Sequence, residues 1–228
     1  MSKKRYAPRI PRNASGFRAQ YLKALPRGAW WAKGWLRGIE EMRIGARAGR
    51  GKVYAEQGQV TSLTVVGTHV EATVLGARPD PYVVKIDFAP LEIGDEGSPV
   101  NVREQLGDMT VGRILAGEMP TSVEELFSKE GLSPYPELGV DSFWCSCPDW
   151  SKPCKHIAAV LYLLADAMVR DPSLLLRLRG ISMTDSDGDR PLDSDGDRPF
   201  EPEALPLWKG NEKLDDFIAR INRRVYRK

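Results

Sequence analysis

The stretch FWCSCPDWSKPCKHIAAVLYLLADAM, residues 143–168, holds all three cysteines of the chain and one of its two histidines. Cys145 and Cys147 are two residues apart, so on an extended segment both thiols point to one face. Cys154 and His156 have the same spacing, which on a regular helix would separate their side chains by about 200°. We therefore expect Cys154 in the turn ahead of a helix and His156 in the first turn of that helix.

These four residues form a complete ligand set for one zinc ion, because three thiolates and one imidazole fill a tetrahedral shell. No coordination position is left for water or substrate, so the pattern predicts a structural Zn²⁺ and a protein that is not an enzyme. A catalytic Cys–His pair requires the base within hydrogen-bond reach of the thiol, and the predicted placement of Cys154 and His156 is poor for that. A redox pair and a zinc deaminase both use Cys-x-x-Cys, which does not occur in this chain. Behind the ligands, a helix is predicted whose apolar face would supply a small core for zinc to stabilise. That face consists of Ile157, Val160, Leu161, Leu164 and Met168.

Upstream of this stretch, the pattern indicates an α+β fold with a three-stranded antiparallel sheet. Residues 59–66, 69–75 and 82–88 are β-branched and alternating, and the two-residue loop at 67–68 favours a hairpin. Before them, Trp31 and Trp35 share one face of an amphipathic helix and are expected in the core.

The whole chain divides into six predicted parts. They are a basic flexible arm (1–28), a Trp-bearing helix plus sheet (29–95), connecting helices (96–141), the zinc finger with its helix (142–180), an acidic linker with a duplicated eight-residue repeat (181–202) and a basic amphipathic C-terminal helix (203–228).

Charge is segregated along the 228 residues. Residues 1–55 contain fourteen Lys or Arg and two acids, whereas the chain as a whole carries only +2. Such a basic region predicts contact with a polyanion or with an acidic protein surface. The candidate nucleic-acid contacts are Trp30, Lys33, Arg37, Arg47, Arg50 and Lys52. Trp30 is included because it points away from the predicted core face and could stack on an unpaired base.

Two partial matches to ligand motifs do not satisfy their templates. GARAGRGKVY (45–54) lacks the first glycine and the final Ser or Thr of a phosphate loop. The aspartate repeat lacks the glycine and glutamate positions of a calcium loop. We therefore expect no small-molecule substrate. No apolar run of the chain approaches the roughly 20 residues of a spanning helix, so we expect no membrane segment. The basic N-terminal residues are not followed by an apolar stretch, so we expect no secretory signal, and the crowded cysteines suit a reducing compartment. A cytoplasmic protein without a membrane partner is expected, one that could associate with the nucleoid.

The ligand pattern followed at once by an apolar helix resembles the SWIM zinc finger, whose four ligands correspond to Cys145, Cys147, Cys154 and His156. The segments WWAKGW, GRGKVYAEQGQV, GARPDPYVVKI and DPSLLLRLRG are also similar to bacterial SWIM finger proteins, so the resemblance covers about residues 28–180. The aspartate repeat is not a feature of that family. The resemblance implies binding of DNA or protein, and partnership with a Swi/Snf-type DNA translocase. Two functions stay open: a non-enzymatic zinc module that binds nucleic acid as an accessory to such a translocase, and a protein–protein adaptor without direct nucleic-acid binding.

Overall fold

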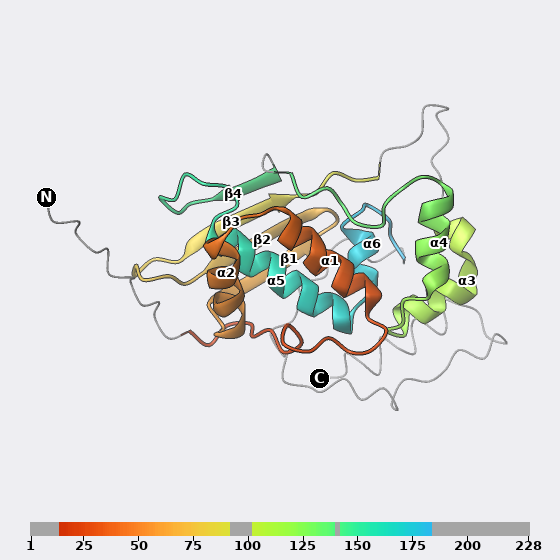
Figure 1. The fold of residues 1–228 in the computed structure, drawn as a ribbon, viewed down its shortest axis with the longest axis horizontal. Coiled ribbons are helices and arrows are strands. Elements are labelled where there is room, and N and C mark those ends of the chain that lie inside the picture. The colour runs from red at the N-terminus through yellow and green to blue at the C-terminus, as the bar shows by residue number, and fades with distance from the viewer. Residues whose placement is uncertain (1–13, 92–101, 140–141, 184–228) are drawn as a thin grey trace, which may run out of the picture.

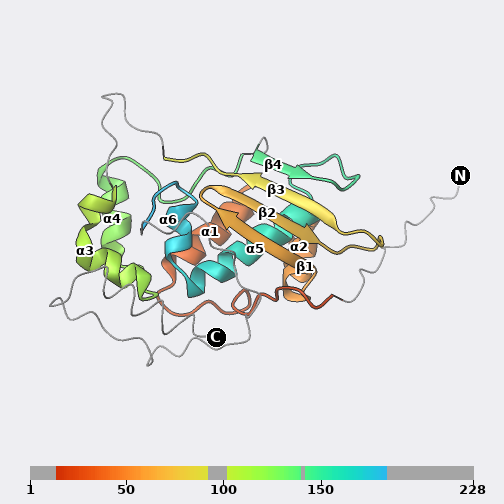
Figure 2. The ribbon, with the colours of Figure 1, turned by 180° about the vertical axis from the view of Figure 1, so that it is seen from behind.

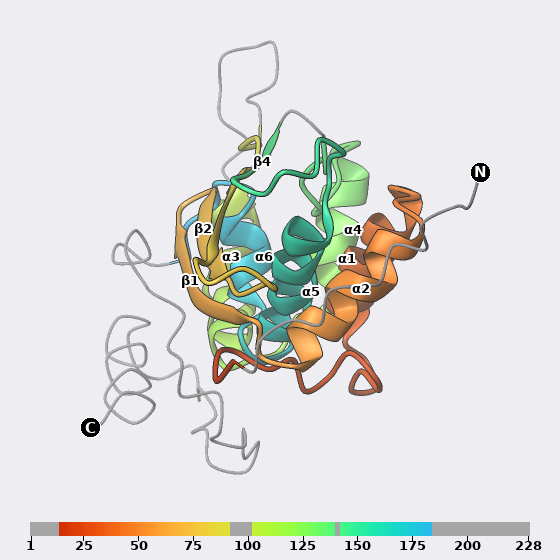
Figure 3. The same ribbon diagram turned by 90° about the vertical axis from the view of Figure 1, so that its left-hand side faces the viewer.

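The computed structural model describes residues 14–91, 102–139 and 142–183, and it confirms the α+β class (Figure 1). An antiparallel sheet, the long helix α5 (Lys155–Arg170) and a pair of helices lie one behind the other (Figure 3). The pair consists of α1 (Trp30–Glu41) and α2 (Ala46–Glu56), which both pack on α5. Helix α5 is thus the middle layer, enclosed from both sides.

The sheet contains the three predicted strands, β1 (Val60–Val66), β2 (His69–Val74) and β3 (Tyr82–Asp87). They pair in chain order, and β1 and β2 are joined by the two-residue turn at 67–68. Gly67 has φ 54°, a left-handed conformation that suits a tight hairpin turn. The alternating apolar residues face α5, and Figure 2 shows the opposite, open face of the sheet.

The sheet has a fourth strand, so the three-stranded prediction is corrected. Strand β4 (Phe143–Cys145) pairs antiparallel with β3, with Val84 opposite Cys145 and Ile86 opposite Phe143. Its three residues are too few to show alternation in the sequence, and only the edge of β3 makes them a strand. Cys145, the first predicted ligand, therefore lies in the sheet, with Cys147 just after the strand, and the two do not form a separate finger unit.

Helix α5 begins and runs as predicted, but its burial is more complete than one apolar face implies. Every residue from His156 to Met168 is buried. A helix covered on all sides needs small as well as large apolar residues, and the alanines between the predicted core positions meet this need. From α1, the buried Trp31 and Trp35 donate indole hydrogen bonds to the Met168 and Leu161 carbonyls of α5, which confirms their core placement.

Helix α2 was not predicted, because two glycines and three scattered basic residues interrupt the apolar periodicity of its sequence. Gly51 faces α5 so closely that a Cβ there would lie 2.5 Å from the Ala158 Cβ. The glycine that weakens the helix signal is thus what lets α2 approach α5.

Part of the predicted flexible arm is packed on the core, which corrects the range 1–28 for its described residues. Phe17 bridges to Val60 at the edge of β1. The main-chain N–H groups of Gln20 and Tyr21 both donate to the buried carboxylate of Asp166 in α5, at 2.7 Å and 2.6 Å. These contacts use long-range partners that the arm's own composition does not reveal.

The predicted connecting region contains α3 (Val102–Leu115), interrupted at Gly107, and α4 (Thr121–Lys129). The two helices lie together at one end of the molecule, far from α2 (Figure 1). After α5, the short α6 (Ser173–Arg177) completes the described fold. The C-terminal helix predicted at 203–228 and nearly all of the linker at 181–202 lie outside the described residues. No helix in the described ranges has the length and apolarity to cross a membrane.

Candidate metal centre

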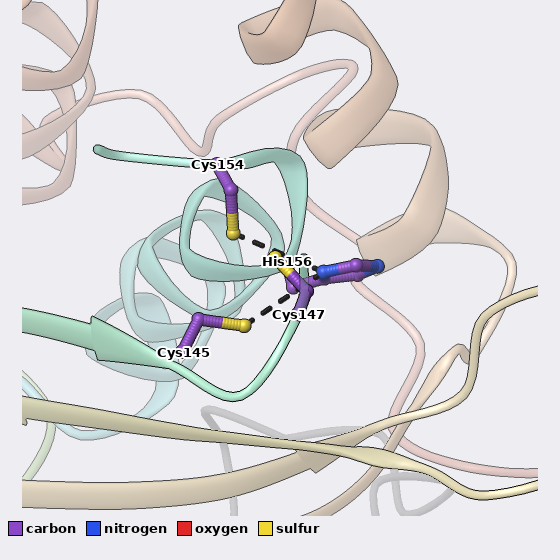
Figure 4. A group of neighbouring side chains, drawn as sticks. All are labelled: Cys145, Cys147, Cys154 and His156. Atoms are coloured by element: carbon purple, nitrogen blue, oxygen red, sulfur yellow. Dashed lines mark hydrogen bonds between the residues drawn. The ribbon is translucent and has the colours of Figure 1, made fainter. Parts of the chain in front are cut away.

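Four side chains converge where β4 and the start of α5 meet. The Sγ atoms of Cys145, Cys147 and Cys154 and a ring nitrogen of His156 all lie within 4.8 Å of one another (Figure 4). His156 Nδ1 is 3.8 Å from the Sγ atoms of both Cys145 and Cys154.

These distances fit one tetrahedral zinc ion. Bonds of about 2.3 Å to sulfur and 2.0 Å to nitrogen place neighbouring ligand atoms roughly 3.6 Å apart around the ion. Three thiolates and one imidazole are also the donor set that zinc prefers in closed structural sites. The protein therefore binds one zinc ion through Cys145, Cys147, Cys154 and His156.

Two local structures orient the ligands as the spacing predicts. After β4, the main-chain N–H of Ser146 donates to the Val83 carbonyl, and the Ser146 hydroxyl accepts from the Val83 N–H. This clamp extends the pairing with β3 and aims the thiols on either side of Ser146. Cys154 is the N-cap of α5, with extended dihedrals of φ −79° and ψ 174°, so its thiol and the imidazole two residues later face the same point.

Aromatic rings enclose the imidazole. Tyr82 of β3 stacks on His156 with centroids 4.4 Å apart and planes at 27°, and Tyr54 of α2 lies at 5.6 Å. Because Nδ1 faces the thiols, the Nε2 atom carries the proton when zinc is bound. Nε2 is buried and has no hydrogen-bond partner among the described residues, and the stacked Tyr82 ring restricts the orientation of the imidazole.

The clustering of thiols explains why the site needs a cation. The pKa of Cys147 falls far below its ordinary value, because the thiols of Cys145 and then Cys154 donate hydrogen bonds to its sulfur. The pKa of Cys145 rises, since its own proton is engaged by Cys147. Three thiolates this close together would repel one another. A divalent cation allows all three to ionise.

The loop between the ligand pairs is tied to α2. Arg47 approaches the Asp149 carboxylate at 3.4 Å and donates to the Ser151 hydroxyl at 3.0 Å. Asp149 in turn accepts the Ser151 N–H at 3.1 Å. Arg47, predicted as a nucleic-acid contact, thus first serves to hold the finger loop.

The other predicted nucleic-acid residues do not form one cluster. Lys33, Arg37 and Arg50 are exposed, whereas Lys52 is half-buried and lies about 200° around α2 from Arg50. Trp30 is half-buried, and its indole N–H donates to the Met119 carbonyl between α3 and α4 at 2.9 Å. Trp30 therefore belongs to the contact between α1 and the α3–α4 pair, and we do not assign it to nucleic acid.

Sequence reasoning overlooked two tryptophans of the finger itself. Trp150, in the loop, is 91% exposed, and Trp144, in β4, is 48% exposed. A loop of six residues between two zinc ligands has little length in which to fold back on the core. This was the available signal for an exposed Trp150.

Comparison with known proteins supports the metal assignment. Residues 139–165 match the SWIM zinc finger family. The chain is also 35% identical over 185 residues to the uncharacterized protein Rv2102 of Mycobacterium tuberculosis, an alignment that covers 78% of this chain and 65% of that protein. The chain thus spans slightly less than two thirds of its mycobacterial relative. No solved structure matches it.

Proposed function

We propose that this SWIM zinc finger protein is a non-enzymatic module that binds nucleic acid, with DNA as the main target. The observation that carries the proposal is the attachment of a basic helix to the finger. Residues 14–56 contain nine Lys or Arg against three Glu, and within this region α2 is fastened to the finger loop through Arg47. Through Arg47 and its exposed neighbour Arg50, part of this positive charge lies on the folded surface beside the metal centre.

The geometry of α2 singles out Arg50. Residues 47, 50 and 54 fall on one flank of the helix, at the i, i+3, i+7 spacing. Arg47 contacts the finger loop, and Tyr54 contacts His156 and accepts a hydrogen bond from Lys155 Nζ at 2.7 Å. Arg50 lies between these two contacts and is exposed. Its guanidinium is thus available to a phosphate at the border of α2 and the finger.

The ligand set supports a role without catalysis, because four protein donors leave zinc no position for a substrate. The partner implied by the SWIM resemblance is a Swi/Snf-type DNA translocase, for which this chain would be an accessory on DNA.

A second candidate function, a protein–protein adaptor, is favoured by one observation. Trp144 is exposed on the open face of the sheet, where a partner protein could cover it.

The test is a titration of duplex DNA at several salt concentrations with the variant Arg37→Ala/Arg50→Ala. We expect binding to weaken for every sequence and the slope of log affinity against log salt to flatten by about 0.9 for each lost phosphate contact. Lys129→Ala, an exposed lysine of α4 at the far end of the molecule, is the control and should leave the slope unchanged. A parent protein that binds neither DNA nor RNA at low salt would favour the adaptor.

A further inference from the structure

We infer that Trp150 stacks on an unpaired base, so that the finger prefers single-stranded nucleic acid to duplex. This inference rests on the proposed function and names the form of nucleic acid that the same surface takes. It starts from the Trp150 side chain itself, which is 91% exposed although it lies in the loop between half-buried and buried metal ligands.

The exposure of Trp150 is built into the loop. On its N-terminal side, Asp149 is paired with Arg47 and accepts the Ser151 N–H. On its C-terminal side, the Ser151 hydroxyl accepts a hydrogen bond from Arg47. The zinc ligands Cys147 and Cys154 anchor the loop ends. The ring is therefore presented outward by a loop secured on both sides, and a bound base would not have to order it.

The charges around the loop suit a polyanion. Lys152 follows Trp150 by two residues and is exposed, and the side chain of Arg47 keeps 36% of its surface accessible while it contacts Asp149. Arg50 lies one turn farther along the same flank of α2. An aromatic platform flanked by cationic groups is the combination that single-strand binding proteins use, with stacking for the base and Lys or Arg for the phosphates.

Stacking distinguishes single strands from duplex. In duplex DNA both faces of each base are covered by neighbours, so a protruding indole reaches a base only where the strand is unpaired or frayed. The basic residues, by contrast, meet phosphates in either form. Loss of Trp150 should thus reduce one affinity and spare the other.

Trp144 provides a matched control within the same finger. It directly precedes Cys145 in the chain, three residues before Cys147, and it is also exposed. Alternation along β4 turns it to the open face of the sheet, opposite α5, and its strand neighbour Lys85 is paired with Glu71 at 3.2 Å. A tryptophan there is remote from the basic flank of α2.

The experiment compares parent, Trp150→Ala, Trp150→Phe and Trp144→Ala in zinc-loaded form. The probes are a single-stranded oligonucleotide, its duplex, and an abasic strand of equal length at one salt concentration. We expect Trp150→Ala to weaken single-strand binding by about 5- to 150-fold, the range for loss of one stacked base. Duplex and abasic-strand affinities should stay within about twofold of the parent. Trp150→Phe should retain most of the single-strand affinity, and Trp144→Ala should match the parent. Zinc content and melting temperature verify that each variant is folded.

Each outcome decides one proposition. If the parent binds nucleic acid but Trp150→Ala binds single strand, duplex and abasic strand as the parent does, the stacking inference is wrong, the proposed function stands, and Trp150 is left to a protein partner. Equal weakening toward all three probes also overturns it, because that pattern belongs to a general loss of the surface. A parent that binds none of the probes overturns the proposed function together with the inference.

Discussion

At the scale of single residues, Asp166 is a buried acid in the most apolar part of the chain. It is 0% exposed, and it accepts the main-chain N–H groups of Gln20 and Tyr21 as well as a 3.1 Å contact from Arg170. Its carboxylate is therefore the attachment point of the N-terminal segment. Burial raises the pKa of Asp166, against the opposing effect of these hydrogen bonds and of Arg170.

We expect Asp166→Ala to destabilise the protein by about 2 kcal/mol, because it strips two partly buried N–H groups of their acceptor. Asp166→Asn, which keeps an acceptor oxygen, should cost less. Urea unfolding measures both free energies. If Asp166→Ala unfolds at the parent's urea midpoint with the same m-value, the contact does not hold the segment.

The parent and Asp166→Asn together also test the pKa of the Asp166 carboxyl group. A raised pKa means that the folded state binds this proton to higher pH than the unfolded chain does. Its stabilising effect is complete below the unfolded pKa of about 4 and is lost as pH rises through the folded pKa. As pH rises over that window, the free energy of unfolding of the parent should therefore fall relative to that of Asp166→Asn.

At the scale of elements, the contact between α2 and α5 links the basic surface to the metal centre. Gly51 is the point of closest approach, where an added Cβ would stand 2.5 Å from the Cβ and 3.0 Å from the main-chain carbon of Ala158. Helix α2 also carries Arg47 to the finger loop and Tyr54 to the imidazole. Its position on α5 therefore decides both contacts.

We expect Gly51→Ala to destabilise the protein by roughly 1–3 kcal/mol, because overpacking outweighs the gain in helix propensity. Zinc affinity, measured by competition with a chelator, should fall with it as Tyr54 moves from His156. Gly49→Ala is the control: nothing lies within 4 Å of a Cβ there, and the better helix former should stabilise α2 by up to about 1 kcal/mol. A Gly51→Ala protein as stable as the Gly49→Ala protein would contradict a close helix contact.

At the scale of the whole molecule, zinc joins two layers rather than stabilising an isolated finger. Cys145 belongs to the sheet and Cys147 follows it, while Cys154 and His156 begin the central helix. The buried residues of the sheet, of α5 and of the helices on its other side form one continuous apolar core. Because α5 contacts both the sheet and the α1–α2 pair, metal binding should be coupled to the stability of the entire core.

We expect zinc removal to lower the midpoint of a single cooperative unfolding transition. With free zinc 1,000-fold above its dissociation constant, linkage predicts about 4 kcal/mol of stabilisation. Calorimetry with and without chelator measures the shift, and metal analysis should find one zinc per chain. Cys154→Ser is the control, since it should contain little zinc and should not respond to chelator. Two separate transitions, of which only one responds to zinc, would instead indicate an independent finger.

Features that depend on local spacing could be predicted from the amino-acid sequence. Two cysteines two residues apart, then a cysteine and a histidine at the start of a helix, defined the ligand set, because ligand direction follows from strand and helix periodicity. Alternation defined the first three strands for the same reason. The helical face of Trp31 and Trp35 likewise predicted their burial.

Contacts between distant segments could not be predicted in this way, because they depend on how the elements pack. Strand β4 exists through the edge of β3, α2 through the small residues of α5, and the N-terminal segment through Asp166, all partners far away in sequence. The two tryptophans Trp30 and Trp150 show the consequence. Trp30 had the basic neighbours of a binding residue but packs against the α3–α4 pair, whereas Trp150, inside the metal motif, is the exposed one. Periodicity tells which residues share one face of an element. Whether that face is buried depends also on the surface that packs against it, and this second surface comes from segments that are distant in sequence.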